Sequence, residues 1–160
     1  EEIKISKSMK KILKKDLFTV TFDKCFEEVI CACGDVRDET WISEKFVETY
    51  TKLYDMGIAH SVEVWNGKRL VGGLYGLSLG KMFFGESMFS IETNSSKIAL
   101  IKLCEYLKEK DYYVVDCQVH NSHLESMGAR EIERSEFLKI LENQINKKGK
   151  YSKWDIQDKK

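Results

Sequence analysis

The stretch DYYVVDCQVHNSH, residues 111–123, decides the fold and supplies the candidate chemistry. Its centre, residues 113–119, is apolar and rich in β-branched side chains, and turn-forming polar residues follow it. This pattern predicts a buried strand. Asp116 and Gln118 interrupt the apolar run. Because residues two apart in a strand point to the same face of a sheet, we expect these side chains to lie together near the strand's end.

Asp116 and Gln118 have two interpretations. A carboxylate in an apolar strand costs free energy unless it is paired or hydrogen-bonded. In the structural interpretation, a backbone amide or a buried lysine satisfies Asp116, and Gln118 ends the sheet. In the functional interpretation, the two side chains form a site. The rest of the chain decides between them.

The segments before this strand predict a strand–helix–strand unit. Residues 97–110 have a broad apolar face typical of a helix, which Asn94 or Ser95 can cap, and residues 82–88 form a strand. The strands on either side of such a crossover helix should run parallel. Two further strands, residues 61–65 and 69–78, are joined by Asn66-Gly67, which predicts a type I′ hairpin.

The remaining segments predict helices and one strand. We expect a basic helix over 9–15 capped by Ser6 or Ser8, and then a strand over 18–22. Two helices should follow, one capped by Asp23 and ended by Gly34, and one over 44–56 capped by Ser43 and ended by Gly57. After the central unit we expect a short helix over 123–127 ended by Gly128 and a last helix over 135–146. At 160 residues, the chain has the size of a single domain over residues 1–160. The prediction is an α+β, acetyltransferase-like (GNAT-like) mixed sheet flanked by helices.

Charge and cysteine usage limit the functional classes. Lys+Arg and Asp+Glu both number 26, but residues 1–15 and 146–160 each hold six lysines against two acidic residues. Such basic ends are either solvated or bind a polyanion. Five cysteines without paired spacing predict reduced thiols in a cytoplasmic protein, and no apolar run is long enough to span a bilayer. His60, His120 and His123 are too scattered to predict a metal site.

The segment before the crossover helix bears on the cofactor. Acetyl-CoA enzymes of this fold need a glycine-rich loop there, because backbone amides at the helix N-terminus hold the pyrophosphate. Residues 91–97 read IETNSSK, with no glycine and with Glu92 where a phosphate would lie. The sequence therefore predicts the fold without its usual cofactor.

Several motifs together resemble one family. They are ISKSMKK (5–11), WI (41–42), HSVEVW (60–65), LVGGLYG (70–76), FGESMFS (84–90) and DCQV (116–119). In this order they resemble leucyl/phenylalanyl-tRNA–protein transferases, over residues 3 to about 142. The resemblance implies transfer of Leu, Phe or Met from an aminoacyl-tRNA to a protein beginning with Arg or Lys, which marks that protein for N-end-rule degradation. It implies no metal and no cofactor, and we expect a monomer.

One departure from the family concerns the N-terminal part. Family members carry an additional N-terminal subdomain with a Trp-Trp-Ser-Pro motif, which this sequence lacks. We therefore expect a chain that starts inside the natural protein, with weakened binding of the tRNA 3′ end.

The resemblance assigns roles to the two polar residues. Aminolysis of an ester needs little base, because about a tenth of an α-amino group is neutral at pH 7. We expect the oxygen of Gln118 to accept a hydrogen bond from the amine, while its NH₂ group donates to Asp116. Glu86 should attract an incoming Arg or Lys. Further substrate-binding candidates are Trp41, Leu74, Phe84, Leu103 and Asn121, with core packing the alternative for the apolar ones.

The basic helix is the candidate tRNA-binding element. Its lysines are Lys7, Lys10, Lys11, Lys14 and Lys15, and its apolar residues Met9, Ile12 and Leu13 can face the core. The helix could bind phosphates of the acceptor stem, or its lysines could simply be solvated. Two rival functions stay open: an acetyl-CoA-dependent N-acyltransferase, and an RNA-binding module without catalysis.

Overall fold

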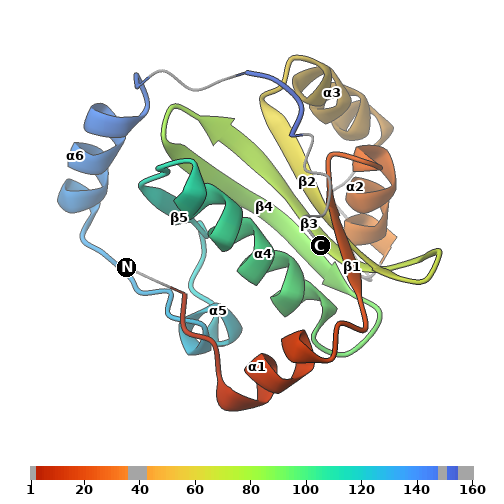
Figure 1. Cartoon of the computed structure of the whole chain (residues 1–160). Helices are drawn as coiled ribbons and strands as arrows, with labels where there is room; N and C mark the ends of the chain where they lie inside the picture. The colour runs from red at the N-terminus through yellow and green to blue at the C-terminus, as the bar shows by residue number, and fades with distance from the viewer. Residues whose placement is uncertain (1–2, 36–42, 148–150, 155–160) are drawn as a thin grey trace.

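The centre of the molecule is a five-stranded sheet in the order β1-β2-β3-β4-β5 (Figure 1). The computed structural model describes residues 3–35, 43–147 and 151–154. The strands are β1 (Thr19–Phe22), β2 (Ala59–Asn66), β3 (Arg69–Leu79), β4 (Met82–Ser90) and β5 (Val114–Asp116). The first four are antiparallel, and β5 runs parallel to β4, as the sequence predicts.

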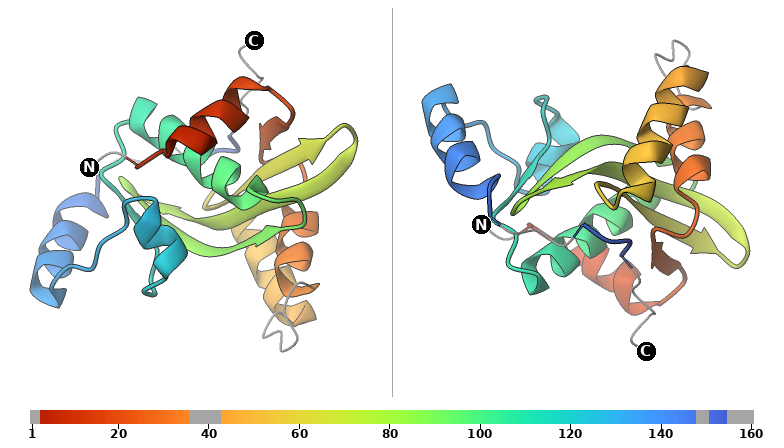
Figure 2. Two further views of the ribbon diagram at one scale, coloured as in Figure 1. Left: turned by 90° about the horizontal axis from the view of Figure 1, so that it is seen from below. Right: turned by 90° about the horizontal axis from the view of Figure 1, so that it is seen from above.

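Helices cover both faces of the sheet (Figure 2). On one face lie α1 (Lys7–Lys14) and α4 (Ser95–Glu109), and on the other lie α2 (Phe26–Asp35) and α3 (Glu44–Asp55). After β5 come α5 (Ser122–Ser126) and α6 (Arg134–Gln144). Each face buries its own apolar cluster, so the sheet divides the core into two layers. No helix among the described residues is long and apolar enough to cross a membrane.

The helix caps are partly as predicted. Ser6 accepts a hydrogen bond from the backbone of α1, and Ser43 does the same for α3. Asn94 occupies the N-cap position of α4, but its side chain makes no capping bond. Two predictions are wrong: α2 continues through Gly34, and the Asp23 carboxylate binds elsewhere, as described below.

The β2–β3 turn differs from the predicted type. The register pairs Asn66 with Arg69, so the two loop residues are Gly67 and Lys68. Within the turn only Gly67 has a positive φ, of 60°. A type I′ turn needs positive φ at both central residues, whereas a type II′ turn needs it at the first alone. The geometry therefore favours type II′, one residue later than predicted.

Strand β5 is shorter and more exposed than its sequence suggests. Only Val114–Asp116 pairs with β4, and these three residues are half-buried. Tyr113 and Val119, at the ends of the predicted strand, are 61% and 76% exposed. As an edge strand, β5 is paired on one side only. The prediction of a buried strand over 113–119 is therefore wrong at both ends.

Near the C-terminus, Trp154 enters the core. It is 5% exposed, and its ring stacks on His60 with the ring centroids 3.8 Å apart and the planes inclined by 5°. Its backbone N–H donates to Asp23 Oδ2 over 2.7 Å. Asp23 therefore links the tail to the sheet, because Oδ2 also contacts His60 Nδ1 at 2.7 Å and Oδ1 accepts from Ser61 N at 2.9 Å.

Candidate active site

Strand β4 contains a bulge where it carries its one acidic side chain. In the pairing of β3 with β4, Tyr75 lies opposite Ser87 and Gly76 lies opposite Gly85, so Glu86 is the extra residue. Bulges re-aim side chains and are common beside active sites. At the bulge, β3 and β4 approach closely and this requires glycine at position 76, because a Cβ there would clash with the Phe84 carbonyl oxygen. Glu86 therefore lies at the bulge, outside the regular pairing of β3 with β4.

The end of β5 brings Gln118 to this bulge. The strand stops at Asp116, which pairs with Phe84, and Gln118 turns away with φ 62°. Its side-chain Nε2 donates to the Gly85 carbonyl oxygen and to Glu86 Oε1, both over 3.0 Å. Two neighbouring strands thus contribute to one exposed polar cluster.

The contact between Asp116 and Gln118 differs from the expected one. Asp116 Oδ1 accepts a hydrogen bond from the backbone N–H of Gln118, over 2.8 Å. The predicted donation from the Gln118 side chain to Asp116 is wrong, because that NH₂ group binds β4 instead. The two residues do not share a strand face either, since the strand ends before Gln118. Asp116 and Gln118 are joined through a backbone N–H, and the Gln118 side chain lies against β4 rather than beside the Asp116 carboxylate.

Tyr50 on α3 is a further partner of Glu86 that the sequence does not reveal. Burial raises the pKa of the Tyr50 hydroxyl to about 12, and the charge of Glu86 and a hydrogen bond to it act in the same direction. The hydroxyl therefore stays protonated at neutral pH and can donate to the carboxylate. A tyrosine on the apolar face of an amphipathic helix gives no sign of such a role.

Cys117 lies between Asp116 and Gln118 in the sequence and is half-buried. Burial raises the pKa of its thiol, and the charge of Asp116 raises it further. Burial also raises the pKa of Cys104 on α4, to about 12. Because the thiolate is the reactive form of cysteine, these raised pKa values disfavour both thiols as nucleophiles at neutral pH. Among the described residues, no group of three or more His, Cys, Asp or Glu side chains could hold a metal ion.

The predicted residues for the donor side chain are not brought together. Leu74 on β3 and Leu103 on α4 are 3% and 1% exposed and pack in the core on the α4 side of the sheet. Phe84 is half-buried and pairs with Leu77, which packs on the α2–α3 side of the sheet. The two leucines thus follow the core-packing alternative, on the opposite face from Phe84. Trp41 lies outside the described residues.

Asn121 has a structural role at the start of α5. Its Oδ1 accepts from the backbone N–H groups of His123 and Leu124, over 2.8 and 3.4 Å. This is an N-cap, which satisfies backbone donors that a short helix leaves open. The same oxygen is therefore already engaged, and a substrate-binding role for Asn121 stays a prediction.

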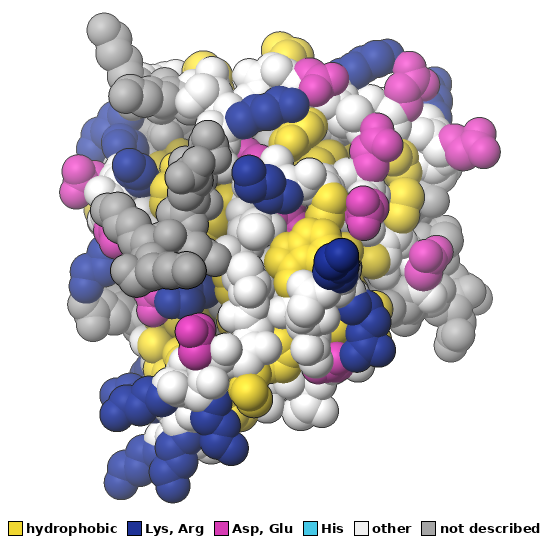
Figure 3. Space-filling model, turned by 45° about the vertical axis from the view of Figure 1, so that its right-hand side comes forward, with side chains coloured by type: hydrophobic (Ala, Val, Ile, Leu, Met, Phe, Trp, Pro, Cys, Tyr) yellow, Lys and Arg dark blue, Asp and Glu magenta, His cyan; other side chains and the backbone are white. Residues whose placement is uncertain are grey.

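Helix α1 presents its lysines to solvent. All five (Lys7, Lys10, Lys11, Lys14 and Lys15) are exposed, and among the described residues none of them has an ion-pair partner. Met9, Ile12 and Leu13 pack against the core, as predicted. Figure 3 shows lysine and arginine side chains gathered at the lower end of the molecule, where α1 lies. The surface is basic and unpaired within the described part of the chain.

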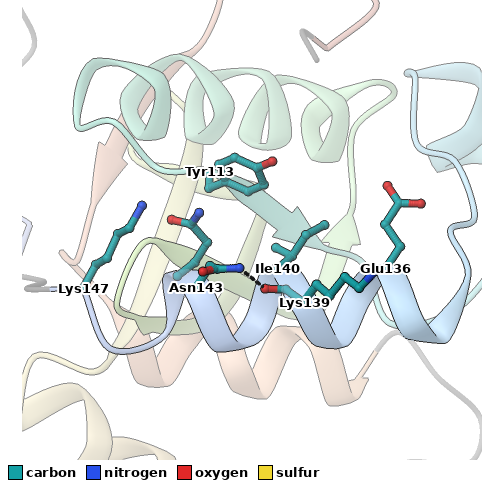
Figure 4. Close-up of a pocket in the computed structure, with 7 residues that line it drawn as sticks. Tyr113, Glu136, Lys139, Ile140, Asn143 and Lys147 are labelled. Carbon is teal, nitrogen blue, oxygen red and sulfur yellow. Dashed lines mark hydrogen bonds between the residues drawn. The ribbon is translucent and has the colours of Figure 1, made fainter.

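A surface hollow lies apart from the site of Glu86 and Gln118. It has a volume of about 410 Å³ and lies between Tyr113, before β5, and one side of α6 (Figure 4). Tyr113 lies across it from Ile140 and Asn143 of α6, with Glu136 and Lys147 towards its ends. None of its lining residues belongs to the Glu86–Gln118 cluster, which sits on open surface.

Solved structures with a similar fold are acetyltransferases. An aminoglycoside acetyltransferase from an uncultured soil metagenomic sample, in complex with sisomicin, matches 75% of this chain and 93% of its own, with a TM-score of 0.61 and 13% identity. A Trypanosoma brucei acetyltransferase matches 73% of this chain and 95% of its own, with a TM-score of 0.55 and 15% identity. The predicted α+β, GNAT-like fold is confirmed.

Sequence comparison identifies the family. The family model described as leucyl/phenylalanyl-tRNA protein transferase matches residues 1–142. The proteins of that name from Flavobacterium johnsoniae and Campylobacter jejuni are 54% and 49% identical over 147 and 148 residues. These alignments cover 89% and 92% of this chain, and 69% and 67% of the relatives. The Legionella pneumophila protein is 49% identical over 97% of this chain and 71% of its own length. The chain belongs to the leucyl/phenylalanyl-tRNA–protein transferase family.

Proposed function

We propose that this chain transfers Leu, Phe or Met from an aminoacyl-tRNA to the α-amino group of a protein that begins with Arg or Lys. The product would carry an N-terminus recognised by N-end-rule degradation. The observation that supports this proposal best is the convergence of Glu86 and Gln118 on one exposed point between parallel strands, in a chain of this family. We place the activity in the cytoplasm, with the protein acting as a monomer.

The chemistry requires orientation more than base catalysis. The amine nitrogen attacks the ester carbonyl carbon, the bond to the ribose oxygen breaks, and the amine proton passes to that oxygen. The attacking amine is already partly neutral at pH 7. Holding it against the ester can supply several kcal/mol of barrier reduction, on the order of 7–11 for ideal alignment. No metal or cofactor enters this sequence of bonds.

Gln118 is suited to orient the amine because its own amide is fixed. Both hydrogens of its NH₂ group are engaged, by the Gly85 carbonyl oxygen and by Glu86. These two acceptors determine which end of the amide is nitrogen and leave Oε1 as an acceptor. Among the described residues, nothing donates to Oε1. We propose that the α-amine of the protein substrate donates a hydrogen bond to this oxygen.

Glu86 provides the preference for a basic acceptor. It is half-buried at the bulge and is hydrogen-bonded to both Gln118 and Tyr50. A carboxylate in a partly desolvated position attracts a guanidinium or ammonium group and repels another carboxylate. The acceptor's first side chain would therefore lie against Glu86 while its α-amine meets Gln118.

The basic face of α1 supports the donor side. Its five exposed lysines can neutralise phosphates of the acceptor stem without reading bases. This suits an enzyme that accepts several tRNAs. The pocket for the donor side chain is proposed near Phe84, with Leu74 and Leu103 packed in the core on the α4 side of the sheet.

Acetyl transfer from acetyl-CoA is the alternative that the fold itself raises. The segment just before α4, where a pyrophosphate would bind, carries the acidic residue Glu92. Glu92 forms an ion pair with Arg69 and accepts from Asn66 Nδ2 over 3.1 Å. A carboxylate at this position repels phosphate. Acetyl-CoA should therefore leave the melting temperature unchanged.

The assay for the proposed function uses labelled leucyl-tRNA and peptides that differ only in their first residue. Peptides beginning with Arg or Lys should gain the label, and those beginning with Glu or Ala should not. A chain that binds leucyl-tRNA but transfers nothing to any peptide would be an RNA-binding module, and the proposed function would be wrong.

A further inference from the structure

Gln118 has an unusual backbone conformation for a residue with a large side chain. Its φ is 62°, and the backbone N–H of Val119 donates to the Cys117 carbonyl oxygen over 2.7 Å. A bond from residue i+2 to residue i, with positive φ at the central residue, defines the rarer, strained form of γ-turn. Residues in such conformations persist only when their surroundings hold them, and they gather at functional sites.

Asp116 supplies the contact that holds this turn. Its Oδ1 accepts from the N–H of Gln118, two residues ahead, over 2.8 Å. Asp and Asn side chains form such bonds readily, replacing the backbone partner that a regular strand would offer. Gln118 itself is exposed, so burial does not keep the turn closed. The carboxylate oxygen of Asp116 therefore restrains the backbone just before the strained residue.

The turn determines where the side chain of Gln118 goes. A continued strand would leave residue 118 on the same sheet face as Asp116. The turn instead directs the amide to β4, where Nε2 meets Gly85 O and Glu86 Oε1. No hydrogen of that amide is left for the Asp116 carboxylate. A role in which Asp116 polarises the Gln118 side chain has no contact to act through.

We propose that Asp116 is a positioning residue that acts on the backbone amide of Gln118, through an acceptor oxygen at this position rather than through its negative charge. This rests on the proposed function for its effect on rate, but its effect on the turn is independent of any activity. An asparagine at 116 offers the same Oδ1 acceptor without the charge. Alanine and leucine offer no acceptor, and leucine keeps the approximate bulk.

The test compares D116N with D116A and D116L in the full chain. We expect D116A and D116L to lose about 10- to 100-fold in kcat/KM for leucyl transfer, and D116N to keep at least tenfold more than either. A D116N protein as slow as D116A, with its fold intact by circular dichroism, would overturn the proposal, because charge would then be the essential property.

A second readout does not depend on activity. The three-bond coupling between the amide and Hα protons of Gln118, measured by NMR, reports its φ. The coupling should be the same in D116N as in the parent protein and should change in D116A and D116L. If it is unchanged in all three variants, Asp116 does not hold the turn and the proposal is wrong, whatever the rates. An inactive parent protein with the expected couplings would instead count against the proposed function alone.

Discussion

Two carboxylate-centred clusters in this molecule are built alike and differ in exposure. Asp23 and Asp116 each accept a hydrogen bond from a backbone N–H, over 2.9 and 2.8 Å. Each also lies at an irregular point of the backbone, because Asp23 itself has a positive φ and Asp116 lies two residues before Gln118, which has one. Asp23 is 8% exposed and covered by His60 and Trp154. The Asp116 cluster ends at Gln118, which is open to solvent.

The comparison shows how structural and reactive polar groups can be told apart. At Asp23, both carboxylate oxygens and the neighbouring imidazole are matched by groups of the protein, which a buried polar group requires. At the end of β5, the amide hydrogens of Gln118 are matched, while none of the described residues donates to its oxygen. The buried cluster therefore contributes stability, and the exposed one retains an acceptor for a substrate.

The largest expected effect concerns the buried cluster. Replacing Trp154 with Ala removes a side chain that packs on His60, Tyr106, Phe83 and Phe22, and should lower the free energy of unfolding by about 3–5 kcal/mol. Urea denaturation measures the change. Tyr151→Ala is the matched control, because Tyr151 is an aromatic residue of the same segment but is 56% exposed. Equal stability of the two variants would show that the tail does not belong to the core.

A smaller effect is expected at Glu86. Glu86→Gln keeps the size of the side chain and removes the charge that we assign to acceptor recognition. The kcat/KM for Arg-initiated peptides should fall about tenfold, the value of one charged hydrogen bond, while the KM for leucyl-tRNA stays constant. Steady-state kinetics with each substrate varied in turn provide both numbers. A variant that binds leucyl-tRNA more weakly and uses peptides normally would move Glu86 to the donor side.

The smallest effect is expected at the basic helix. Replacing Lys11 and Lys15 with Ala should weaken all donor tRNAs alike and flatten the log–log dependence of affinity on salt by about one to two units. Lys45→Ala with Lys68→Ala is the control, because both lysines are exposed on other elements. If the Lys11/Lys15 variant keeps the full salt slope of the control, the lysines of α1 are merely solvated and the tRNA binds elsewhere.

The sequence could predict what depends on periodicity. The apolar face of α4 and the inward side of α1 follow from repeating apolar positions, and the parallel pairing of β4 with β5 follows from the strand–helix–strand order that those positions predict. The end of β5 could not be predicted in this way. Gln118 is in a conformation that depends on bonds from Asp116 and β4, which only the folded chain supplies.

Other misses have the same origin in tertiary contacts. Trp154 lies in a lysine-rich segment that resembles a solvated tail, and its place in the core depends on Asp23 and His60. Asp23 looks like a helix cap because it precedes α2, yet its carboxylate faces the sheet. Local propensity predicts which segments form helices or strands, whereas the hydrogen-bond partner of a polar side chain depends on residues far away in the sequence.

The most direct test of the central claim compares rate and stability in Gln118→Ala. The account predicts that leucyl transfer to an Arg-initiated peptide falls by about 10²-fold or more, because the amine loses its orienting acceptor. The free energy of unfolding should fall by no more than about 1–2 kcal/mol, the value of the exposed hydrogen bonds that this side chain makes with β4. Adding Asp116→Ala should cost little further rate, since the two residues act as a unit. Near-normal turnover by a folded Gln118→Ala protein would contradict the account.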